Sequence, residues 1–130
     1  MRKVWRGITT AVLGLTLSGG VARAGTLTTP LIAPPAPQYA NDCYVINVSN
    51  QPVTVTVKMV GLFGSQGDTN TCTIPPGDLS DFCAAFLQGA GFCKVTSPLA
   101  TDALRRAVRA VLMTSKTTAP FQIEAIVEAR

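Results

Sequence analysis

Four cysteines are the residues of this chain best suited to covalent chemistry: Cys43, Cys72, Cys83 and Cys93. None of them forms a C-x-x-C motif for thiol exchange, and no two are close enough in sequence to be the ligand pair of a structural zinc site. In a chain that leaves the cytosol, an even number of cysteines is typical of disulfides. We therefore expect two disulfides, each of which stabilises a small domain by about 2–4 kcal/mol.

Two pairing schemes fit the spacing of these cysteines. Cys72 and Cys83 are equally far from the centre of a turn at residues 76–79, so a simple hairpin would place them side by side. Cys43 would then pair with Cys93. Cys83 and Cys93 are just as well centred on the next turn along the chain, so that hairpin could carry the bridge instead. We favour the first scheme and leave the second open.

The chain has no histidine, which removes the residue on which most catalytic arrangements depend. Ser-His-Asp and Cys-His nucleophiles, histidine-ligated copper and most catalytic zinc sites are excluded. A serine activated by Lys58 or Lys94 remains, but no spacing selects a serine for that role. The acidic pair Asp78 and Asp81 flanks a turn, where aspartate ordinarily caps backbone amides. We predict that the chain is not an enzyme and has no cofactor or metal.

A glycine-rich segment at residues 61–70 could bind a ligand or a partner. Its oxygens at Asp68 and Asn70 are too few for calcium, and it lacks the Lys and Ser/Thr of a phosphate-binding loop. We therefore predict a flexible connection between strands. Leu62 and Phe63 would lie at its exposed tip, and they are our candidate contact for a partner.

The first 24 residues have the order of a secretory signal peptide. Basic residues at Arg2, Lys3 and Arg6 precede an apolar stretch at 7–17, and an A-x-A cleavage site ends at Ala24. The apolar stretch is shorter than the roughly 20 residues that span a bilayer. We predict Sec-type export, cleavage after Ala24 and a periplasmic or extracellular location, with no membrane span in the mature chain.

Loss of this segment changes the charge of the chain. Four of its eleven basic residues lie in the first 24 positions, so seven remain to balance seven acidic residues. Nucleic-acid binding requires a basic surface that displaces counterions. Because the mature chain lacks that excess, we exclude a nucleic acid as its partner and expect an unidentified protein or envelope component.

The mature chain is long enough for one domain. Residues 25–40 contain four prolines, which cannot donate to a sheet ladder, so we predict a Pro-rich tail or tether there. The remaining residues, 41–130, would form a single domain.

Strand patterns recur through this domain. Residues 53–59 alternate between apolar and polar side chains, which is typical of a half-buried strand, and residues 43–60 as a whole favour a hairpin. Further strands are predicted near 71–74, 81–87, 92–97, 107–114 and 121–127. We predict a mainly β fold of about seven strands, an antiparallel β-sandwich with an immunoglobulin-like or similar Greek-key arrangement.

One segment fits two structures. Apolar residues in 102–113 recur at helical spacing, with arginines on the opposite face. The strand alternative turns Val108, Ala110 and Leu112 inward and pairs this segment with the final strand. We favour the strand, whereas a helix near 102–113 would make the fold α+β.

Several segments also show a resemblance to other proteins. The run CYVINVSNQPVTVTVKMVG, a second cysteine before a Pro-Gly turn, and the later segments FCKVT and VRAVL resemble small exported bacterial proteins with disulfide-containing β domains of unknown function. The resemblance covers roughly residues 43–114. It implies a bacterial compartment outside the cytosol and a strand at residue 108, and it implies no activity and no functional residues.

Together these patterns predict a non-catalytic secreted or periplasmic module that binds an unknown ligand or has a structural role. The neutral charge, the cysteines and the lack of a catalytic arrangement favour this hypothesis. The alternative is a surface assembly subunit whose N-terminal tail adds as a strand to a neighbour's sheet.

Overall fold

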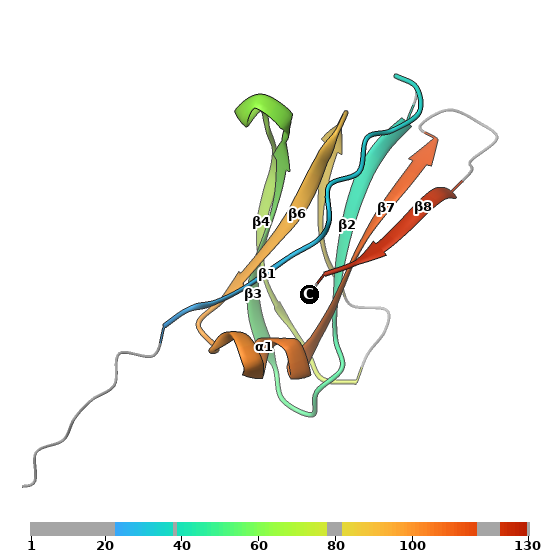
Figure 1. Ribbon diagram of the computed structural model, residues 1–130. Helices are drawn as coiled ribbons and strands as arrows, with labels where there is room; N and C mark the ends of the chain where they lie inside the picture. The colour runs from blue at the N-terminus through green and yellow to red at the C-terminus, as the bar shows by residue number, and fades with distance from the viewer. Residues whose placement is uncertain (1–22, 38, 78–81, 117–122, 130) are drawn as a thin grey trace, which may run out of the picture.

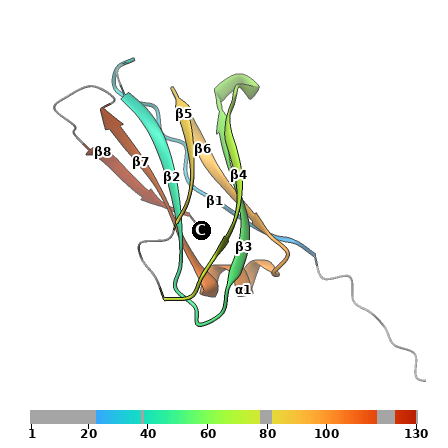
Figure 2. The same ribbon diagram turned by 180° about the vertical axis from the view of Figure 1, so that it is seen from behind.

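The computed structural model describes residues 23–37, 39–77, 82–116 and 123–129. Within these ranges, eight strands form two antiparallel sheets of four strands that face each other as two layers (Figures 1 and 2). The first sheet has the order β1-β6-β3-β4 and the second the order β5-β2-β7-β8. The elements are β1 (Gly25–Thr28), β2 (Tyr39–Asn47), β3 (Val53–Gly61), the 3₁₀ turn η1 (Leu62–Gly64), β4 (Gln66–Ile74), β5 (Cys83–Gln88), β6 (Gly91–Ser97), α1 (Thr101–Ala107), β7 (Val108–Lys116) and β8 (Ile123–Glu128). The predicted mainly β sandwich is confirmed, with eight strands in place of about seven.

The core lies between the two sheets and follows the period of two in the sequence. On β3, Val55, Val57 and Met59 are fully buried, as the alternation predicts. On β7, Val108, Ala110 and Leu112 are at most 1 % exposed. These two strands belong to different sheets, so their inward faces meet across the core.

The predicted hairpin over residues 43–60 is wrong, although both of its strands exist. β2 belongs to the second sheet and β3 to the first, so the chain crosses between layers instead of turning back within one sheet. The crossing is held by Asn47, a fully buried side chain. Its Nδ2 donates to the carbonyl oxygens of Gln51 at 2.6 Å and Ile74 at 3.0 Å, and its Oδ1 accepts from the backbone N–H and hydroxyl of Ser49.

The Pro-rich tail predicted at residues 25–40 is wrong for its first part. Gly25–Thr28 pairs antiparallel with β6 as an edge strand, and Leu27 is only 2 % exposed. Further along, Ile32 forms a backbone bridge with Gly91. The four prolines all follow β1, so they remove no donor from its ladder. The packed part of the chain therefore begins well before residue 41.

Gly25 lies against the corner that leads into α1, and its backbone N–H donates to the carbonyl of Leu99 at 2.6 Å. Gly25→Ala is expected to lower the free energy of unfolding by about 1–2 kcal/mol, because the added methyl group would crowd this corner. An added Cβ would lie 2.4 Å from the Leu99 carbonyl oxygen and 2.7 Å from the Thr101 nitrogen, and neither is a mobile side-chain atom. Urea unfolding measures the loss. Thr28→Ala, an exposed change on the same strand, is the matched control, and equal stability of the two variants would contradict the crowding argument.

The segment at 102–113 contains both of the structures that its sequence fits. α1 ends at Ala107, having buried Leu104 and Ala107, and the chain then becomes extended at Val108 with φ of −129°. From there β7 pairs with β2 over nine residues and with β8 on its other side. The strand prediction is correct from Val108 onward, and the helical alternative is correct only for the residues before it. No helix in the described ranges has the length and apolar character needed to cross a membrane.

Candidate interaction surface

The residues considered for catalysis do not come together in the described part of the chain. Lys58 and Lys94 face each other across β3 and β6, and no described serine forms a hydrogen bond with either lysine. Ser97 donates to the Thr54 carbonyl and Ser115 to the Asp42 carboxylate, while Asp78 and Asp81 lie outside the described residues. The described residues also contain no group of three or more side chains suited to hold a metal ion.

Both disulfides join one sheet to the other. Cys43 on β2 is bonded to Cys93 on β6, and Cys72 on β4 is bonded to Cys83 on β5. This is the first of the two schemes considered from the spacing, but the hairpin argument behind it does not apply, because β4 and β5 lie in different sheets. Cys43, Cys83 and Cys93 are fully buried. The cysteines are therefore structural links, and no described cysteine carries a free thiol.

The glycine-rich segment at 61–70 is mostly strand, contrary to the predicted flexible connection. β4 begins at Gln66, so Asp68 and Asn70 both lie in a strand: Asn70 is paired with Val57 of β3, and Asp68 falls at the irregularity of this ladder. Only η1 forms a turn, and there Phe63 is fully exposed at a φ of +58°, a backbone conformation that is rare for a bulky residue. Leu62 is 41 % exposed, and its N–H donates to the Ala90 carbonyl at 3.0 Å. The two candidate contact residues do lie at an exposed tip.

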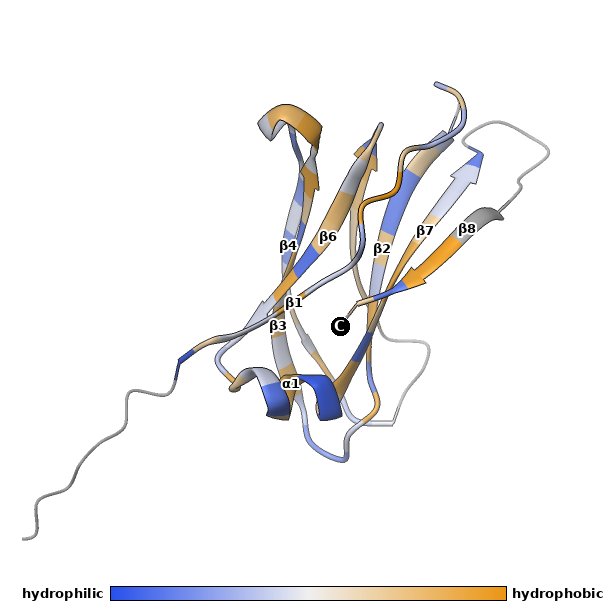
Figure 3. Ribbon diagram, viewed as in Figure 1, coloured by the Kyte–Doolittle hydropathy of each residue, from blue (hydrophilic) through white to orange (hydrophobic). Residues whose placement is uncertain are grey.

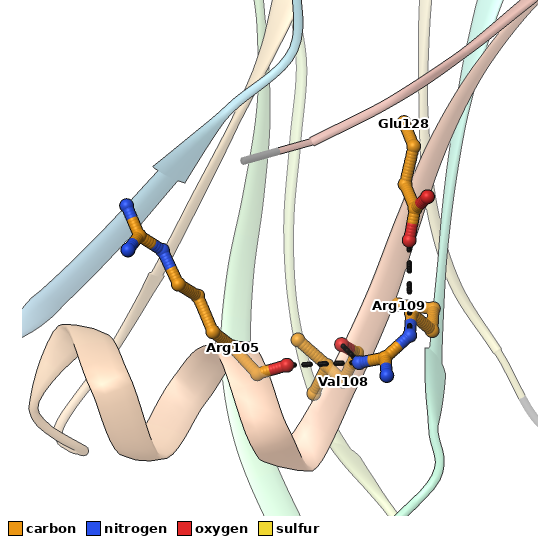
Figure 4. Close-up of polar contacts among 4 residues, drawn as sticks. All are labelled: Arg105, Val108, Arg109 and Glu128. Carbon is orange, nitrogen blue, oxygen red and sulfur yellow. Dashed lines mark hydrogen bonds and ion pairs between the residues drawn. The ribbon is translucent and has the colours of Figure 1, made fainter.

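A cleft of about 520 Å³ opens beside α1, between Leu27 of β1 and the end of β8. One of the charged side chains that line it is Arg109, drawn in Figure 4. Nη1 donates to the carbonyls of Arg105 at 2.8 Å and Val108 at 3.0 Å, and Nε lies 3.7 Å from Glu128 Oε1. Arg109 thus binds carbonyls that the end of a helix leaves without partners. We interpret this cluster as a helix-to-strand junction.

The outer face of the first sheet is polar throughout its centre. Hydroxyl pairs link β3 to β4, Thr54 with Thr73 and Thr56 with Thr71, each at 2.9 Å. Such a surface is typical of a sheet face exposed to water. The polar residues on this face are Thr26, Thr28, Thr54, Thr56, Lys58, Thr69, Thr71, Thr73, Lys94 and Thr96.

The outer face of the second sheet is apolar instead, and we call it the apolar face. Three of its side chains are well exposed: Phe86 at 39 %, Phe82 at 53 % and Ile126 at 60 %. Figure 3 shows hydrophobic colour along β8, the last strand of this sheet. Exposed apolar side chains that adjoin one another mark a contact surface in soluble proteins. The apolar face consists of Tyr44 and Ile46 on β2, Phe82 and Phe86 at β5, Val111 and Met113 on β7, and Ile126 on β8.

Aromatic packing and electrostatics both act at the centre of the apolar face. The rings of Tyr44 and Phe82 pack edge to face with centroids 5.4 Å apart, a favourable aromatic geometry. Burial, and then the negative charge of Asp42, raise the pKa of the Tyr44 hydroxyl above its ordinary value. The phenol therefore stays neutral at physiological pH, so it adds no charge to this face.

Sequence reasoning missed the apolar face because it followed only the inward residues of each strand. The signal was present in β7, where Val111, Leu112 and Met113 form an unbroken apolar run, and in β2, where Tyr44 and Ile46 flank the buried Val45. Strands whose two faces are both apolar are covered on both sides. Such a run indicates that the outer face of the second sheet is apolar as well.

The fold and the disulfides define a small two-layer β-sandwich with covalent links between its layers. No protein-family model, curated protein or solved structure matches this chain. Its function must therefore be inferred from its own surfaces.

Proposed function

We propose that the chain is an exported, non-catalytic binding module that contacts its partner through the apolar face. The observation that supports this most directly is the contrast between the two outer faces of one sandwich. Threonines and lysines cover the centre of the first sheet, with Val60 and Phe92 towards one end. Aromatic and aliphatic side chains predominate on the second sheet, beside Asp42, Arg109 and Glu128. Since water would contact both sheets equally in an isolated domain, the difference favours a partner at the second sheet.

Export of the chain and its cleavage after Ala24 are part of this proposal, and the two disulfides support the export. Disulfides persist in oxidising compartments and are rare in the cytosol of mesophiles. The proposed location is therefore periplasmic or extracellular, where an envelope component or another protein can reach the face.

The N-terminal tail is a weaker candidate for the contact. Strand addition to a neighbour would use the backbone groups of residues 25–28, and these groups pair with β6 of the same chain. The apolar face has no comparable cover among the described residues. We therefore assign the contact to the apolar face.

Photo-crosslinking in the producing cell tests the proposal without knowledge of the partner. A photoreactive phenylalanine analogue at Phe86 is expected to give a covalent adduct, because this side chain lies on the apolar face. The same analogue at Thr71, exposed on the polar face, is the matched control and should give none. Adducts are detected as a shift in mass on denaturing gels. Absence of an adduct from Phe86, or equal adducts from both positions, would contradict the proposal.

A further inference from the structure

Two opposite charges are placed symmetrically beside the apolar face, on the same side of the second sheet. Asp42 lies two residues before Tyr44 on β2, and Arg109 lies two residues before Val111 on β7. Tyr44 and Val111 are register partners in the antiparallel β2–β7 ladder. An antiparallel pair has a local two-fold axis through such partners, so Asp42 and Arg109 occupy equivalent positions on opposite sides of the pair. The face therefore carries a carboxylate on one side of its centre and, at the matching place on the other, a guanidinium that is paired with Glu128.

These charges do not neutralise each other within one chain. Met113 is the register partner of Asp42 and lies four residues from Arg109 along β7, which puts the two charged residues roughly 14 Å apart. Asp42 accepts a hydrogen bond from the Ser115 hydroxyl at 3.0 Å. Among the described residues the ion pairs are Arg105 with Asp102 and Arg109 with Glu128, so Asp42 has no cation. A carboxylate without a cation, on an apolar surface, is suited to a positive group from outside the chain.

Arg109 is held in place and is still accessible. Its bonds to the carbonyls of Arg105 and Val108 fix the guanidinium, while its side chain remains 49 % exposed. A guanidinium has five N–H donors, so these bonds leave capacity for a second carboxylate beside Glu128. Asp42 and Arg109 are thus an acceptor and a donor that could meet only between two molecules.

We propose that the apolar face binds a second copy of this chain, so that Asp42 of each copy faces Arg109 of the other across a two-fold axis. This inference rests on the proposed function and names its partner. A two-fold interface requires a self-complementary surface, and an apolar centre flanked by symmetric opposite charges is self-complementary. Two sheets that pack face to face in this way are the usual geometry of a β-sandwich, repeated here between molecules. The apolar centre of the contact consists of Tyr44, Val111 and Met113, with the two charge pairs at its sides.

Charge reversal on separate chains tests this arrangement. The exported chain, purified with both disulfides intact, is expected to have the molar mass of two copies by light scattering. Asp42→Arg alone places two pairs of positive charges in contact, and Arg109→Asp alone places two pairs of negative charges in contact. Each variant should weaken self-association by about tenfold or more, because facing like charges are strongly unfavourable at an interface.

Mixing the two variants gives the decisive result. In a mixed pair, the arginine introduced at position 42 faces the aspartate introduced at position 109, and the native Asp42 and Arg109 face each other at the second contact. An equimolar mixture of two monomeric variants should therefore recover the dimer mass. An interaction within one chain cannot produce this recovery.

Control variants separate the interface from effects on folding. Lys94→Asp reverses a charge on the polar face and should leave the molar mass unchanged. Met113→Glu places a charge at the apolar centre without removing the Arg109 bonds, so it should give a monomer that the mixing partner cannot rescue. Circular dichroism of each variant shows whether the fold is kept.

The results also separate this inference from the proposed function. A wild-type chain that stays monomeric up to its solubility limit, single variants that remain dimeric, or a mixture that stays monomeric would each overturn the second-copy proposal. If the chain is monomeric while Phe86 crosslinks to a protein of another mass, the apolar face is still a binding surface with a different occupant. If Phe86 gives no adduct at all, the proposed function fails as well.

Discussion

Cys43→Ala combined with Cys93→Ala is expected to lower the free energy of unfolding by about 4 kcal/mol or more. The disulfide closes a loop of 50 residues, and the loss of conformational freedom that it imposes on the unfolded chain corresponds to about 4 kcal/mol. Both cysteines are fully buried, so their removal also leaves unfilled space in the core. Small domains have total stabilities of about 5–15 kcal/mol, so this change removes a large part of the total. Chemical denaturation followed by circular dichroism measures the loss.

The second disulfide provides the matched comparison. Cys72 and Cys83 are separated by 11 residues, and the corresponding entropic contribution is about 3 kcal/mol. Cys72 is also only partly buried, so less packing is lost on substitution. The Cys72→Ala, Cys83→Ala double variant should therefore be the more stable of the two. The reverse order would show that neither loop length nor burial governs the stabilisation.

Asn47→Ala is expected to destabilise the domain by about 3 kcal/mol, because its buried hydrogen-bond partners would lose their bonds. The side chain donates to the carbonyls of Gln51 and Ile74 and accepts from Ser49, so one residue connects the crossing after β2 to the end of β4. Ile74 is only 2 % exposed, so water cannot take the place of the Asn47 amide as the hydrogen-bond donor to its carbonyl. Thermal and urea unfolding of the variant measure the effect.

Asn50→Ala is the control for this prediction. Asn50 lies in the same turn but is exposed, so its replacement should change the free energy of unfolding by less than about 0.5 kcal/mol. A similar small change for both variants would mean that the crossing between the sheets does not depend on the Asn47 amide.

The sequence was sufficient to predict most strands of this fold, but not β1, the first part of β4 or the helix α1, and not how the strands pair. The alternation of Val53, Val55 and Val57 identifies an inward face whether the neighbouring strand lies beside it or across the core. Residues 43–60 therefore looked like a hairpin, although β2 and β3 belong to opposite sheets. Whether the chain turns back within one sheet or crosses to the other depends on Asn47 and its hydrogen bond to the carbonyl of Ile74, which is distant in sequence.

The boundary at residue 107 shows a second limit of local patterns. Leu104, Ala107 and Val108 fit a helix, while Val108, Ala110 and Leu112 fit a strand, so Val108 belongs to both patterns. The end of α1 depends on long-range pairing of β7 with two neighbouring strands and on the Arg109 contact with Glu128. Propensity along the chain contains no information about these partners.

The contact predicted from the sequence, the exposed tip of Leu62 and Phe63, is not part of the apolar face, which the sequence analysis did not predict. The apolar face is assembled from four strands that are far apart in the sequence, and its residues adjoin only when their register is known. The positions of Asp42 and Arg109 depend on that register as well.

For the export that we propose, the arrangement of the disulfides has a consequence for how the chain crosses the membrane. Each covalent link spans the two layers, and neither joins neighbours within one sheet. A newly made chain in a reducing cytosol would have free thiols at all four positions and would lack both disulfides between its layers. Such a chain should remain loose enough to be threaded through a translocation channel and become rigid only on the oxidising side.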